Sequence, residues 1–166
     1  MAILKSNKKN IPIEELLALE FKFGEIDKQE NQEWLNFDIV FHLGQETKVF
    51  SSQTKHEQTQ TGVEGQVGKF AFNLKPCNGV EELCRMIENF LDNDAQDSVF
   101  FEPIDPSFEL KIERTQISGE YKVYCWVDAG NTQHLEYSWD AQGIRFIASE
   151  EAVQSFVTSL TNEIAS

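Results

Sequence analysis

The chain has 166 residues, of which 28 are Asp or Glu and 14 are Lys or Arg, so its formal net charge is -14. This length predicts a single domain that can bury a hydrophobic core, and a hydrophobic fraction of 40% with 13 Phe excludes a disordered chain. The negative charge argues against nucleic acid and anionic membranes as partners, because their phosphates repel carboxylates.

The amino-terminal residues 1–10 contain three lysines and no acidic residue. We predict that they form a flexible basic tail, as chain termini commonly do, and that residues 11–166 form a single α+β domain. Pro12 in a first helical turn predicts a short helix from Ile13 to Ala18. The apolar stretch at this end is too short for a secretory signal, and no run approaches the roughly 18 apolar residues of a membrane helix.

Alternation of apolar and polar residues predicts antiparallel strands in the first half of the chain. The clearest strand places five apolar side chains on one face: Leu35, Phe37, Ile39, Phe41 and Leu43. Similar alternation predicts strands at 19–23, 47–51 and 70–74. The polar residues 51–62 between them predict a long loop or an exposed ribbon tip.

Two amphipathic helices are predicted from apolar residues at helical spacing. Asn78 would cap the first, with Glu81 completing a capping box, and Ser149 would cap the second. The apolar stripe of the first helix is Val80, Leu83, Cys84, Ile87 and Leu91, and that of the second is Val153, Phe156, Val157, Leu160 and Ile164.

Short alternating segments between the two helices predict a meander of strands, joined by turns at 118–119, 128–131 and 140–143. The predicted fold class is α+β, a predominantly antiparallel β-sheet of about eight strands with two main helices packed on it. The side chains expected inside are Leu35, Phe37, Ile39, Phe41, Phe70, Phe72, Leu110 and Val123.

The residues that could carry enzyme or metal chemistry are scattered. Neither Cys-x-x-Cys nor Gly-x-Ser-x-Gly occurs, and the three histidines, His42, His56 and His134, lack the spacing of a metal site. We therefore predict no enzyme activity, no metal and no cofactor. The three cysteines, Cys77, Cys84 and Cys125, predict free thiols in a reducing compartment and hence a cytoplasmic protein.

Acidic residues are concentrated in one segment, since ten acidic and two basic residues lie between Glu81 and Glu113. Two interpretations are open: a solvated face that keeps the protein soluble, or a docking face for a basic partner. The candidate partner-binding residues are Glu102, Asp105, Glu109 and Glu113. Because alternate residues of a strand share a face, Glu109 and Glu113 should point together, away from the core.

Three aromatic residues, Trp34, Tyr124 and Trp126, fall on the strand faces opposite the predicted core. Such side chains are covered by a helix, a loop or a second subunit, or they form a binding hot spot. Both interpretations remain open.

The stretch Ser98-Val-Phe-Phe-Glu-Pro-Ile-Asp-Pro-Ser-Phe-Glu-Leu110 resembles the F-x-E-P-x-x-x-F-x-L strand pair of WapI-like immunity proteins, with Phe101 directly before Glu102-Pro103. The order of the predicted elements is similar over roughly residues 19–147. These are small bacterial proteins associated with contact-dependent polymorphic toxins. The resemblance implies a non-enzymatic cytoplasmic binding protein that neutralises a cognate basic toxin. The alternative is a ligand-binding or dimeric assembly domain with no toxin partner.

Overall fold

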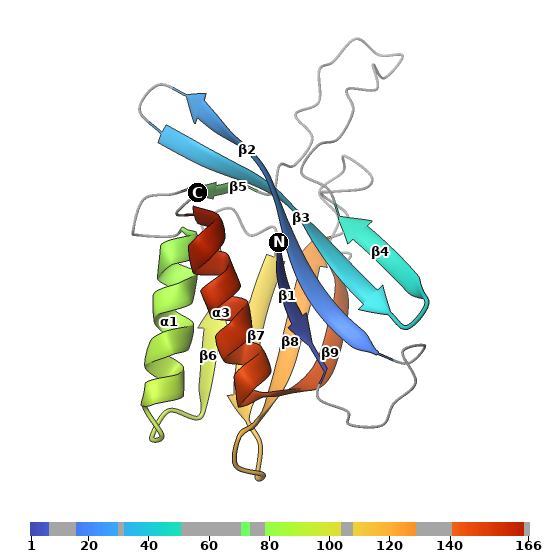
Figure 1. Cartoon of the computed structure of the whole chain (residues 1–166), viewed down its shortest axis with the longest axis vertical. Coiled ribbons are helices and arrows are strands. Elements are labelled where there is room, and N and C mark those ends of the chain that lie inside the picture. The colour runs from blue at the N-terminus through green and yellow to red at the C-terminus, as the bar shows by residue number, and fades with distance from the viewer. Residues whose placement is uncertain are drawn as a thin grey trace.

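Two antiparallel sheets and two helices make up the part of the chain that the structure, a computed structural model, describes (Figure 1). That part comprises residues 1–6, 16–29, 32–50, 71–73, 79–103, 108–128 and 141–164. The predicted α+β class with predominantly antiparallel strands is confirmed, and the strands are divided between two sheets.

The first sheet has the strand order β1-β2-β3-β4, with β5 also paired to β3. Its strands are β1 (Ala2–Lys5), β2 (Leu17–Gln29), β3 (Gln32–Leu43), β4 (Glu46–Phe50) and β5 (Ala71–Asn73). The second sheet has the order β6-β7-β8-β9. Its strands are β6 (Ser98–Phe101), β7 (Phe108–Arg114), β8 (Glu120–Asp128) and β9 (Ala141–Ser149).

The helices α1 (Val80–Asp92) and α3 (Glu150–Ile164) pack against each other. They lie side by side in Figure 1, with α1 also against β6 and α3 along β1. No helix among the described residues is long and apolar enough to cross a membrane. The predicted stripes are confirmed, with Val80, Leu83, Cys84 and Ile87 buried on α1 and Val153, Phe156, Val157 and Leu160 buried on α3.

One core joins both sheets to α3, and phenylalanine rings are at its centre. The fully buried Phe21 of β2 contacts Phe108 of β7 and Phe156 of α3, with centroid separations of 5.6 and 5.5 Å. Of the side chains predicted inside, Phe37, Ile39, Phe41, Leu110 and Val123 are buried. Phe70 and the side chains of Leu35 and Phe72 lie outside the described part of the chain.

The prediction of a flexible tail is wrong for Ala2–Lys5, which form β1 on β2. Ala2 and Leu4 are fully buried beneath α3, and four residues are too few for their alternation to stand out in the sequence. The short helix predicted up to Ala18 is also wrong at its end, because β2 begins at Leu17. Residues 7–15 lie outside the described ranges.

The predicted capping residue is confirmed for α3, and the predicted capping box of α1 is wrong. Ser149 caps α3 as predicted, because its Oγ accepts a hydrogen bond from the Ala152 N–H at 3.2 Å. Gly79 occupies the cap position of α1 without a side-chain hydrogen bond, so the predicted capping box is wrong. Asn78 itself lies outside the described residues.

The turn predicted to end at Gly143 is a strand instead, since Ala141–Ser149 forms β9 and pairs Gly143 with Trp126. The ring of Trp126 lies so close to Gly143 that an added Cβ would overlap it. A glycine is therefore required at this position because the Trp126 ring leaves no room for a side chain, and not because the chain turns there. The strand predicted at 135–139 is outside the described ranges.

Candidate functional site

The strand β7 places two of the candidate acidic residues on one side. Phe108, Leu110 and Ile112 are buried, whereas Glu109 is exposed and Glu113 is half-buried on the opposite side. Glu102 is exposed just after the end of β6, and Asp105 lies outside the described residues. Glu109 and Glu113 therefore share a face, as the alternation predicts.

The register of the second sheet gives these acids their neighbours. We call the side of this sheet that points away from the core the outer face. Its cross-strand rows are Ser98, Glu113, Lys122 and Ile147; Phe100, Lys111, Tyr124 and Arg145; and Glu109, Trp126 and Gly143.

Basic residues separate the acids on the outer face. Lys111 lies between Glu109 and Glu113, and its Nζ donates to Glu113 Oε1 at 2.8 Å. Hydrogen bonds from Lys111 and Tyr124, together with the charges of Lys111 and Lys122, lower the pKa of Glu113. On the whole outer face five acids lie among three bases: Glu102, Glu109, Glu113, Glu120 and Asp128, with Lys111, Lys122 and Arg145. The predicted acidic face therefore contains charges of both signs.

Two large aromatic side chains stand out on the outer face, where Phe100 is 46% and Trp126 is 45% exposed. Tyr124, two residues before Trp126 on β8 and in the cross-strand row of Phe100, is half-buried. The side chain of Trp34, the third aromatic residue singled out in the sequence, lies outside the described residues. No described helix covers Phe100 or Trp126, and both are exposed in a rigid antiparallel sheet.

Replacing Gly143 with Ala should destabilise the protein by about 1 kcal/mol or more, because the new methyl group would displace the Trp126 ring. The same replacement in a Trp126→Ala background should cost almost nothing, since the obstructing ring is gone. The free energy of unfolding of the four proteins in urea gives this coupling. An equal cost in both backgrounds would mean that the ring does not hold the glycine in place.

The exposed sides of the two helices carry a denser set of acids. We call α1 and α3 together the helix layer. It has seven acids and one base: Glu81, Glu82, Glu88 and Asp92 with Arg85 on α1, and Glu150, Glu151 and Glu163 on α3. Arg85 donates to Glu82, three residues before it, and the other charges of the layer are all negative. Sequence reasoning counted the α1 acids but not those of α3, of which Glu163 pairs with the amino group of Met1.

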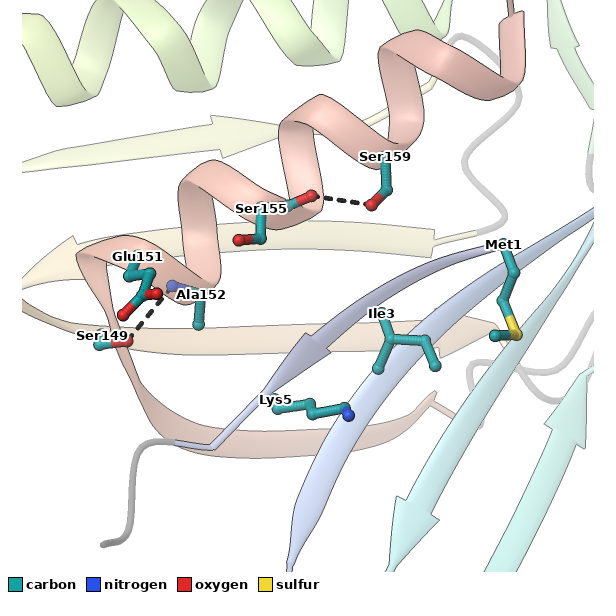
Figure 2. Close-up of a pocket in the computed structure, with 8 residues that line it drawn as sticks. All are labelled: Met1, Ile3, Lys5, Ser149, Glu151, Ala152, Ser155 and Ser159. Carbon is teal, nitrogen blue, oxygen red and sulfur yellow. Dashed lines mark hydrogen bonds between the residues drawn. The ribbon is translucent and has the colours of Figure 1, made fainter. Parts of the chain in front are cut away.

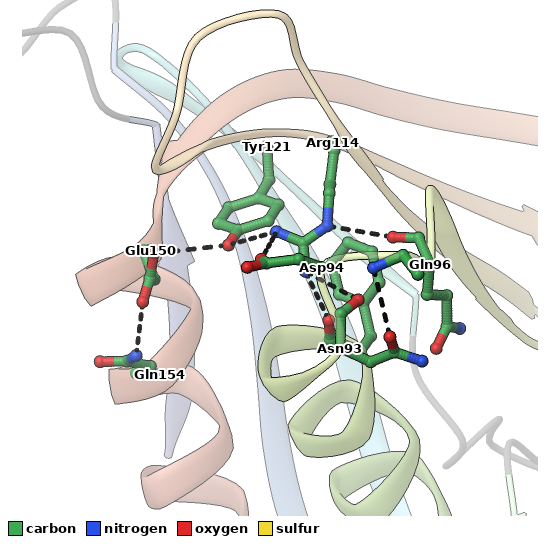
Figure 3. Close-up of polar contacts among 9 residues, drawn as sticks. Asn93, Asp94, Gln96, Arg114, Tyr121, Glu150 and Gln154 are labelled. Carbon is green, nitrogen blue, oxygen red and sulfur yellow. Dashed lines mark hydrogen bonds and ion pairs between the residues drawn. The ribbon is translucent and has the colours of Figure 1, made fainter.

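A polar cluster ties the helix layer to the second sheet (Figure 3). Arg114 of β7 donates to the carbonyl oxygens of Phe90 at 2.7 Å, Gln96 at 3.0 Å and Asn93 at 3.2 Å, all at or just beyond the end of α1. Its guanidinium group also lies 4.8 Å from the centre of the Phe90 ring. These donors are used to hold the helix end, so the cluster is structural.

A shallow groove of about 420 Å³ runs between β1 and α3 (Figure 2). Met1, Ile3 and Lys5 line one side, and serine, alanine and glutamate side chains of α3 and its cap line the other. The Ser149 hydroxyl caps α3 and the Ser159 hydroxyl donates to the Ser155 carbonyl oxygen. Those two serines are thereby engaged within the chain, and the groove has no set of converging reactive groups among its lining residues.

Reactive side chains do not gather elsewhere in the described ranges. No group of three or more His, Cys, Asp or Glu there could hold a metal ion. Burial raises the pKa of the Cys84 and Cys125 thiols, and His42 Nε2 lies 2.7 Å from Glu20 Oε2 in an isolated pair. Cys77, His56 and His134 are outside the described ranges.

No family model matches the chain, and a search of curated proteins found no match.

Proposed function

We propose that this chain is a non-enzymatic cytoplasmic binding protein that captures a basic protein partner through the helix layer. The observation that carries the proposal is the charge of that layer, where seven acids and one base lie on two adjoining helices. The outer face, where Glu109 and Glu113 were expected to bind the partner, has basic residues between its acids and is the weaker candidate.

The arrangement of the helix layer suits capture by charge. Its acids stand on two helices whose opposite sides are fixed in the core by Leu83, Ile87, Phe156 and Leu160. Carboxylates held at a protein surface attract a cationic partner over roughly 10 Å at about 0.1 M salt and raise the association rate. A partner could approach them without disturbing a buried side chain.

The identity of the partner as a toxin rests on the resemblance to WapI-like immunity proteins. The residues that carry the resemblance are mostly packing residues here, because Phe101, Pro103, Phe108 and Leu110 are buried and Glu102 is exposed. The resemblance therefore concerns how the strand pair packs, and the partner-binding surface follows from charge.

Capture from the native cell tests the surface. Glu88→Lys, Asp92→Lys and Glu163→Lys together reverse three exposed acids of the helix layer near the ends of the helices that favour positive charge. Glu46→Lys, Glu102→Lys and Glu109→Lys change the net charge equally at exposed positions elsewhere. We expect one basic protein to be retained by the wild type and the second variant and lost by the first. Equal retention by both variants would contradict the proposal.

A growth assay tests the toxin identity separately. The retained protein should arrest growth when expressed alone, and co-expression of the wild-type chain should restore growth. The helix-layer variant should not restore it, because it no longer captures the toxin. If the retained protein does not arrest growth, the chain would still bind a basic protein, but the immunity function would be ruled out.

A further inference from the structure

We infer that the outer face is the interface of a symmetric dimer between two copies of this chain. This goes beyond the proposed function, which uses the helix layer. The starting observation is that the side chains of Phe100 and Trp126 are nearly half exposed on a sheet face. Each has acidic or basic residues as neighbours on that face. Exposed aromatic residues with an arginine nearby are typical of the centre of protein interfaces.

Charge selects a second copy as the occupant. Two chains of net charge -14 repel each other, so a contact between them requires a surface on which opposite charges can pair. The three cross-strand rows contain two acids, Glu109 and Glu113, and three bases, Lys111, Lys122 and Arg145. Within these rows both acids lie on β7, whereas Lys122 and Arg145 lie on β8 and β9. Three further acids lie at the margins of the face: Glu102 just after β6, and Glu120 and Asp128 at the two ends of β8.

A two-fold axis parallel to the strands, midway between β7 and β8, makes the two halves complementary. It lays β7 of one copy over β8 of the other, and β6 over β9. Within the rows, Glu113 then lies over Lys122 of the second copy and Phe100 lies over Arg145 of the second copy. These are an ion pair and a cation–π pair. A two-fold axis perpendicular to the strands would instead lay Glu109 over Glu113 of the second copy and Lys111 over Lys111 of the second copy, so like charges would meet.

The size of the face is that of a small interface. Three strand spacings of about 4.8 Å and roughly 30 Å of strand length give a plane of roughly 450 Å² before side chains at its margins are included. This is about half of the ~800 Å² per partner of a standard interface, so the dimer belongs to the weak, reversible class. Because β8 and β9 each have nine residues, the interface can extend along their full length.

Charge reversal across the inferred interface gives a test that a monomer cannot imitate. Glu113→Lys alone places Lys over Lys122 of the second copy, and Lys122→Glu alone places Glu over Glu113, so each variant should weaken its own dimer by about tenfold or more. An equimolar mixture of the two variants restores opposite charges at both symmetric contacts. The mixture should therefore form a mixed dimer at a concentration at which neither variant dimerises alone. Glu109→Lys, which meets Trp126 across the axis, is the matched control and should remain dimeric.

Sedimentation equilibrium of the full chain measures these states, since the monomer has a mass of 19.0 kDa. Circular dichroism shows that each variant is folded. The wild type should sediment as a dimer, each single reversal as a monomer and the mixture as a dimer. A monomeric wild type at every concentration tested, or single reversals that dimerise as well as the wild type, would overturn the inference. Loss of dimerisation without loss of partner capture would leave the proposed function intact.

Discussion

Replacing Phe156 with Ala should lower the free energy of unfolding by about 3–5 kcal/mol. The Phe156 side chain is fully buried, and its ring meets the Phe21 ring edge to face with centroids 5.5 Å apart. Phe21 in turn contacts Phe37 and Phe108, one from each sheet. The cavity left by Phe156→Ala would therefore open where α3 and both sheets meet, and neighbouring rings fixed in place could not fill it.

Urea denaturation measures this loss, and Ser155→Ala is the matched control. Ser155 is the preceding residue on α3 and is exposed, so its replacement should change stability by less than about 0.5 kcal/mol. A loss below roughly 1 kcal/mol for Phe156→Ala would mean that α3 is peripheral to the fold.

Replacing Arg114 with Met should destabilise the protein by about 3 kcal/mol, because several carbonyl oxygens lose a charged donor at once. The last carbonyl groups of a helix have no partner within the helix, and α1 has no basic residue in its last turn. Arg114 supplies that charge from β7, with its side chain only 22% exposed. Met keeps much of the apolar contact with Phe90 and removes the hydrogen bonds.

Arg85→Met on α1 is the control for this variant. Arg85 pairs with Glu82 on the exposed side of the helix, with 63% of its side chain exposed. Such surface pairs contribute about 0.5 kcal/mol or less. Equal losses of unfolding free energy for the two variants would show that the contacts of Arg114 beyond the helix end add no stability.

The predicted elements were those whose periodicity continues long enough to be visible. β7 and β8 bury every second side chain, β3 buries Phe37, Ile39 and Phe41, and α1 and α3 keep their stripes over several turns. β1 has four residues and gives no such signal. The turn predicted to end at Gly143 is wrong because the glycine lies in β9 under the Trp126 ring, a neighbour that only the strand register determines.

The same limit applies to the candidate site. The alternation within β7 correctly placed Glu109 and Glu113 on one side. The bases that balance them, Lys122 and Arg145, come from β8 and β9, and local spacing carries no information about cross-strand neighbours. The acidic side of the helix layer was equally hidden, because α1 and α3 are far apart in the sequence and adjoin only in the fold.

The most direct test of partner capture by the helix layer is the association rate of the retained basic protein, measured by stopped flow over a range of ionic strength. For the wild type the rate should fall steeply as salt is added, because salt screens exposed charges. The variant with Glu88→Lys, Asp92→Lys and Glu163→Lys should associate more slowly at low salt and depend little on salt. Equal rates with equal salt dependence for the two proteins would contradict capture by the helix layer.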